Sequence, residues 1–60
     1  MTGKEYRKLR ESRGWSQREL AIRLGVDQNT VARRERGESP IDDETAHAVR
    51  RVVEMEEGSE

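Results

Sequence analysis

The sequence predicts an all-α domain with four helices, or five, and three observations carry this prediction. No stretch alternates polar residues with β-branched or aromatic residues, and no Asn-Gly or Asp-Gly hairpin turn occurs. Two capping boxes, Thr2 with Glu5 and Ser16 with Glu19, each mark the start of a helix. The 60 residues suffice for one small domain that buries about 60% of the surface of its unfolded chain, so a large catalytic cavity is not expected.

The composition restricts how this domain is stabilised. Hydrophobic residues make up 30% of the chain and charged residues 42%, and cysteine is absent, so neither disulfides nor thiolate metal sites support the small core. No apolar run approaches the roughly 18 residues of a membrane span, and Met1 to Lys4 lack the apolar stretch of a secretion signal. We therefore expect a cytoplasmic protein that does not contact a membrane.

Start and stop signals divide the chain into helices. They predict helices at residues 3–13, 17–24, 28–36 and 43–56. Gly14, Gly25 and Gly37 stand where the first three helices end, because glycine accepts the positive φ of a helix C-terminus. Asp27 and Asp42 precede the last two helices and are expected to be their N-caps.

Charge is distributed unevenly along the chain, although the formal net charge is only -1. Residues 1–37 contain ten Lys or Arg and five Asp or Glu, whereas residues 38–60 contain two and eight. A basic front and an acidic rear fit a surface oriented toward a polyanion, but two solvated helix faces would give the same pattern. We expect residues 1–56 to form a single domain and the acidic residues 57–60 to be a disordered tail.

The second and third predicted helices are separated by only Gly25, Val26 and Asp27. Two helices joined by a three-residue turn that contains glycine cross at a steep angle, which leaves the outer face of the second helix free to enter a DNA major groove. Ala21 suits such a crossing, because its small side chain lets the third helix approach closely. Any small helical bundle can contain a tight turn of this kind, so the spacing alone does not decide the function.

A dense set of motif residues surrounds this turn: Ser16-Gln17-Arg18-Glu19-Leu20-Ala21, Leu24-Gly25-Val26, Thr30-Val31 and Glu35-Arg36-Gly37. Together they resemble the phage repressor and Cro-type (XRE-like) helix-turn-helix family. The resemblance extends upstream through Leu9, Arg10 and Gly14 and fades after Ile41. It implies a repressor-like helix-turn-helix domain that binds double-stranded DNA and regulates transcription.

The resemblance also implies that the third helix reads the bases. If Val31 and Glu35 face inward, a rotation of about 100° per residue places five residues on the outer side, which are Arg36 and four that are expected to contact bases. These expected base contacts are Gln28, Asn29, Ala32 and Arg33. Gln and Asn pair with adenine, Arg pairs with guanine, and Ala packs against a thymine methyl group. The same residue types also suit a helix face that is merely solvated.

Expected contacts to the DNA backbone come from Ser16, Gln17, Arg10 and Arg36. Gln17 occupies the first position of the second helix, where free N–H groups favour a phosphate. Arg10 has a second expected role, because Arg10 and Glu35 occupy the positions of a helix-bridging ion pair in the family. Losing one partner of such a pair would leave a partly buried charge.

Two features depart from the family pattern. Arg34 stands where relatives commonly have an aromatic or aliphatic residue, so we expect its stem to cover the core edge and its guanidinium to reach the acidic last helix or DNA. Trp15 is expected to supply part of the missing apolar volume. The acidic segment from Glu38 to Glu44 stands where relatives often place basic residues, and it should attract phosphate little.

The last predicted helix carries an apolar stripe that is wide for one small core: Ala46, Ala48, Val49, Val52, Val53 and Met55. We expect part of it to form a dimer interface, with Val49, Val52, Val53 and Met55 as candidates. A two-fold dimer would place two recognition helices about 34–36 Å apart and would read a pseudopalindromic operator. Alternatively, the stripe closes over the first three helices and the chain is a monomer.

These features predict a sequence-specific transcriptional regulator, most simply a repressor or autoregulator that binds as a homodimer. The alternative is an antitoxin-like or adaptor domain that acts mainly through protein contacts of the last helix. An enzyme is not expected, because the chain lacks cysteine and a glycine-rich phosphate loop and has one histidine, His47. His47 has no second His or Cys beside it, so we expect no metal or other cofactor.

Overall fold

The computed structural model describes the backbone of residues 1–58 and the side chains of residues 1–55. All regular structure in this range is helical: α1 (Gly3–Ser12), α2 (Gln17–Leu24), α3 (Gln28–Glu35) and α4 (Asp43–Gly58). The prediction of an all-α domain is therefore confirmed. α4 continues past its predicted end at residue 56, and residues 59–60 of the predicted tail lie outside the described residues.

Side chains at the first two helix starts satisfy backbone N–H groups that a helix leaves unpaired. The hydroxyl of Thr2 accepts a hydrogen bond from the Glu5 N–H at 3.1 Å, and the Glu5 carboxylate accepts one from the Thr2 N–H at 3.0 Å. Ser16 and Glu19 form the same reciprocal pair at the start of α2. Both predicted capping boxes are present, so these helix starts are encoded locally.

Each helix contributes one fully buried residue to the centre of the fold: Tyr6, Leu20, Val31 and Val49. Trp15, Ala21 and Val53 complete the core. Val49 and Val53, two of the four residues expected at a dimer interface, are buried in the core of the same chain. The physical reason is the small size of the domain, which needs the apolar stripe of α4 to cover α1 and α2.

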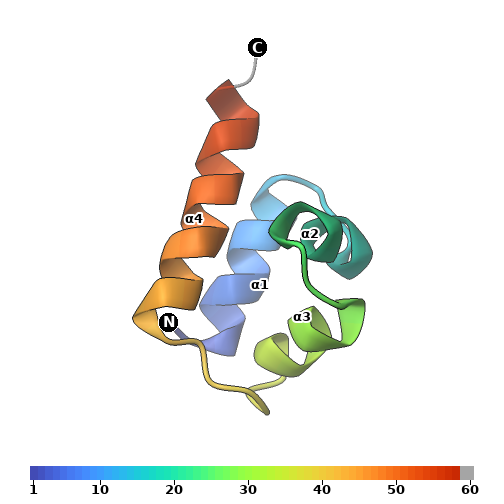
Figure 1. Ribbon diagram of the computed structural model, residues 1–60, viewed down its shortest axis with the longest axis vertical. Helices are drawn as coiled ribbons and strands as arrows, with labels where there is room; N and C mark the ends of the chain where they lie inside the picture. The colour runs from blue at the N-terminus through green and yellow to red at the C-terminus, as the bar shows by residue number, and fades with distance from the viewer. Residues whose placement is uncertain (59–60) are drawn as a thin grey trace.

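The four helices are arranged so that α3 keeps an open outer face. Figure 1 shows α4, the longest helix, beside α1, with α2 and α3 gathered on the other side. α3 packs mainly against α2 and α1, whereas α4 packs against α1 and α2. No helix in the described part of the chain is long and apolar enough to cross a membrane.

The first turn of α1 lies directly against the end of α3. A Cβ atom at Gly3 would lie 2.5 Å from the carbonyl oxygen of Arg34 and 2.6 Å from that of Glu35. Such distances are far inside van der Waals contact, so only glycine fits at this crossing. Gly3 therefore allows α1 to support the C-terminal end of α3.

Candidate nucleic-acid interface

The turn between α2 and α3 sets the direction in which α3 leaves. Gly25 ends α2 with a φ of 73°, a left-handed conformation that costs glycine little. The Val26 N–H donates to the Ala21 carbonyl oxygen at 3.0 Å, and the Asp27 carboxylate accepts from the Asn29 N–H at 3.1 Å. Only three residues therefore separate the end of α2 from the start of α3, which has the N-cap that the sequence predicted.

The outer face of α3 presents polar side chains to solvent. Gln28, Asn29 and Arg33 are exposed, and Ala32 between them is half-buried. Within the described residues, no side-chain hydrogen bond or ion pair engages Gln28, Asn29 or Arg33. Their amide and guanidinium groups are therefore available to an external partner.

The inner face of α3 carries a carboxylate that three helices share. Arg10 on α1 donates from Nε to Glu35 Oε2 at 2.6 Å and from Nη2 to Glu35 Oε1 at 3.1 Å. Gln17 on α2 donates from Nε2 to the same Oε1 at 3.1 Å. The two charged side chains are only 11% and 5% exposed, and the hydrogen bond to Glu35 raises the pKa of Arg10. Glu35 thus ties α1 and α2 to α3.

This arrangement changes what three expected backbone contacts can do. A third donor of Arg10, Nη1, is bonded to the Trp15 carbonyl oxygen at 2.7 Å, so its guanidinium is directed inward. Gln17 is half-buried and uses one amide hydrogen on Glu35. Ser16 is exposed, and its oxygen accepts from the Glu19 N–H. Ser16 and Gln17 retain groups that face solvent, whereas Arg10 acts within the fold.

Arg36, just after α3, is held by a carboxylate that our sequence analysis did not pair with it. Arg36 Nε lies 3.0 Å from Glu38 Oε2, and Arg36 Nη2 lies 3.2 Å from Glu38 Oε1. Both side chains are more than half exposed. These hydrogen bonds lower the pKa of Glu38 and raise that of Arg36. Only the adjacency of the two residues across Gly37 could have indicated the pair.

Arg34 faces α4, with which it lines a common cavity, but its hydrogen-bond partner lies on α1. Its Nη1 donates to the hydroxyl oxygen of the buried Tyr6 at 3.1 Å, and the guanidinium carbon lies 5.8 Å from the centre of that ring. No salt bridge joins it to α4 within the described residues. Trp15 packs in the core as expected, and Arg23 covers its ring at 4.3 Å from the centroid.

Two remaining groups of predicted residues lie on α4. His47 is exposed, and no group of three His, Cys, Asp or Glu in the described part of the chain could hold a metal ion. Val52 is half-buried and Met55 is 64% exposed. Of the four dimer-interface candidates, only these two have apolar surface outside the core.

Comparison with known proteins agrees with this geometry. A helix-turn-helix family model matches residues 7–54 of the 60-residue chain. No curated protein and no solved structure gave a match. The matched segment contains α2, the turn, α3 and the ion pair between Arg10 and Glu35. The chain belongs to the helix-turn-helix family of the phage repressor and Cro (XRE) type, whose members are DNA-binding transcription regulators.

Proposed function

We propose that the chain recognises a specific double-stranded DNA sequence with the outer face of α3. Gln28, Asn29 and Arg33 supply hydrogen bonds to base edges, and Ala32 contacts a thymine methyl group. The observation that carries this proposal is that these three polar residues make no side-chain hydrogen bond or ion pair within the described residues, while a carboxylate on the inner face of α3 holds the helix in place. Residues that make base contacts must be both free and well positioned.

The proposed phosphate contacts come from residues that flank the groove. Ser16 and Gln17 stand at the N-terminal end of α2, where the helix dipole favours an anion. Arg36 joins them once it leaves Glu38. Arg10 contributes indirectly, because it fixes the carboxylate that Gln17 contacts.

We further propose that two copies bind together and act as a repressor or autoregulator. A chain with a net charge of -1 gains little from phosphate attraction, so a single copy should bind weakly. Val52 and Met55 provide apolar surface on α4 for a second copy. Two-fold pairing would read a pseudopalindrome with half-sites about 34–36 Å apart.

Selection of bound sites from random duplex DNA tests this function. We expect the wild-type chain to enrich a pseudopalindromic motif, and Arg33→Ala to lose discrimination at one position of each half-site. Lys8→Ala is the matched control, because it removes one positive charge from the exposed surface between α1 and α4. If no motif is enriched, sequence-specific recognition is refuted.

A second candidate function is that of an antitoxin-like or adaptor domain. A shallow groove of about 370 Å³ on the outer side of α4 favours it, with Ala48, Val52 and Met55 among its lining residues. Such a domain should keep its activity when Gln28 and Arg33 are both changed to Ala. A DNA reader should lose site discrimination with the same double substitution.

A further inference from the structure

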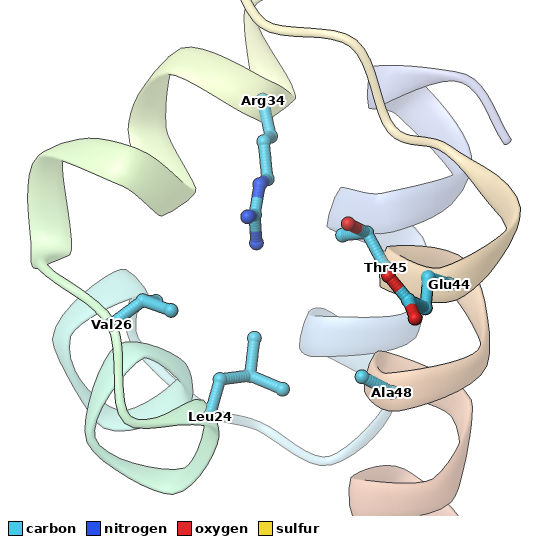
Figure 2. Close-up of a pocket in the computed structure, with 6 residues that line it drawn as sticks. All are labelled: Leu24, Val26, Arg34, Glu44, Thr45 and Ala48. Carbon is cyan, nitrogen blue, oxygen red and sulfur yellow. The ribbon is translucent and has the colours of Figure 1, made fainter.

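A cavity of about 240 Å³ lies between the helix-turn-helix and α4. Figure 2 shows its lining residues, which come from α2, the turn, α3 and α4: Leu24, Val26, Arg34, Glu44, Thr45 and Ala48. Three of them are apolar, one is a threonine, and the exposed Glu44 adds a carboxylate to the lining. The guanidinium of Arg34 points into this space. The cavity is therefore mainly apolar, with one positive charge directed into it.

The guanidinium of Arg34 has one hydrogen-bond partner among the described residues. The side chain is half-buried, and its hydrogen bond goes to the neutral hydroxyl of Tyr6 at 3.1 Å. No carboxylate in the described part of the chain forms a salt bridge with it. Asp42 lies near enough for Arg34 to contribute to its lowered pKa, but the Asp42 carboxylate accepts the Thr45 N–H at 2.8 Å as an N-cap.

Arg10, unlike Arg34, has several hydrogen-bond partners within the fold. That side chain has two bonds to one carboxylate and a third to a carbonyl oxygen. A partly buried charge without such partners favours an anion in contact with it. Arg34 is thus suited to an anion from outside the chain.

We propose that this cavity binds a small organic carboxylate with a short apolar tail. The carboxylate pairs with the free guanidinium hydrogens of Arg34, and the tail contacts Leu24, Val26 and Ala48. The volume equals that of about eight water molecules at roughly 30 Å³ each, which fits an acid such as hexanoate. The carboxylate of Glu44, which also lines the cavity, disfavours each further negative charge on the ligand.

Such an occupant would contact two parts of the molecule at once. Arg34 belongs to the recognition helix, whereas Thr45 and Ala48 belong to α4. The hydrogen bond from Arg34 to Tyr6 also connects the site to α1. The ligand site is therefore separate from the DNA-reading face but shares a helix with it.

A titration of the ¹⁵N-labelled full chain with sodium hexanoate, followed by NMR, tests the site without DNA. We expect saturable shifts for the amides of Leu24, Val26, Arg34, Thr45 and Ala48. Hexanamide, which has the same tail and no charge, should bind about tenfold or more weakly, because it lacks the negative charge that forms an ion pair with the guanidinium. Equal binding of hexanoate and hexanamide would overturn the proposal.

Two variants test whether the charge of Arg34 is the one that binds hexanoate. Arg34→Met keeps an apolar stem and should lower the affinity for hexanoate about tenfold or more. Arg33→Met is the control: it removes an equal charge from the exposed outer face of α3 and should leave the affinity for hexanoate unchanged. If the two variants bind hexanoate equally well, the proposal is refuted. It is also refuted if hexanoate shifts only the amides of the groove beside Lys8 and Arg50. If Arg34→Met fails to fold, the comparison of hexanoate with hexanamide on the wild-type chain decides.

Discussion

Arg10→Met removes one partner of the ion pair between α1 and α3 and keeps a side chain of similar reach. Glu35 is 5% exposed, so the substitution leaves a nearly buried carboxylate with only the amide of Gln17 as a partner. Breaking a buried pair in this way costs about 3–5 kcal/mol. At about 0.05–0.15 kcal/mol per residue, the 60-residue chain has roughly 3–9 kcal/mol of stability in total. The variant should therefore lose a large part of its folding free energy.

Thermal unfolding followed by circular dichroism measures this loss. For a domain of this size, 1 kcal/mol shifts Tm by about 4–8 °C, so we expect a decrease of at least about 12 °C. Arg7→Met is the matched control, because its ion pair with Glu11 is more than half exposed and is worth about 1 kcal/mol or less. The double variant Arg10→Met with Glu35→Met should recover much of the loss. If Arg10→Met and the Arg7→Met control have the same Tm, the reasoning is refuted.

Three further predictions concern other parts of the chain. Gly3→Ala should destabilise the fold by about 1–3 kcal/mol in urea unfolding, because the new Cβ meets the carbonyls at the end of α3, and unchanged stability would contradict this. Glu38→Gln should release Arg36 and raise the affinity for duplex DNA. The slope of log K against log salt concentration should steepen by about 0.9 for each added phosphate contact. Anisotropy titrations at two salt concentrations measure both quantities, and values equal to those of the wild type would count against the prediction. The hydrogen bond from the Thr45 N–H lowers the pKa of Asp42 in the folded state. Above the pKa of about 3.9 that Asp has in the unfolded chain, the wild type should therefore be more stable than Asp42→Asn. This advantage should disappear as the pH falls through the lower pKa of the folded state. A difference between these two proteins that stays constant with pH would refute the last prediction.

Features encoded by neighbouring residues were predictable from the sequence. Ser16 and Glu19 are three positions apart and cap α2 without help from the rest of the fold. Gly25 marks the turn for a similarly local reason. The pairing of Arg10 with Glu35 joins distant residues, and it was expected because the family resemblance added information that spacing alone lacks.

Features that depend on side-chain direction could not be predicted in this way. The stripe of α4 fits a core or an interface equally well by its periodicity, and only the packed structure shows that Val49 and Val53 lie inside. Arg34 faces α4, as expected, but its sequence position does not reveal that the Tyr6 hydroxyl is within its reach. The pairing of Arg36 with Glu38 depends on the chain reversal at Gly37.

The carboxylate of Glu35 helps to hold α3 in the fold without using the side chains on its outer face. Side chains that hold α3 in place, Val31 and Glu35, are inside, whereas Gln28, Asn29 and Arg33 make no side-chain hydrogen bonds or ion pairs within the described residues. Substitutions at those three outer positions should therefore alter the preferred DNA sequence at little thermodynamic cost to the fold. A chain built in this way can acquire new target sites by single substitutions while its folded architecture is conserved.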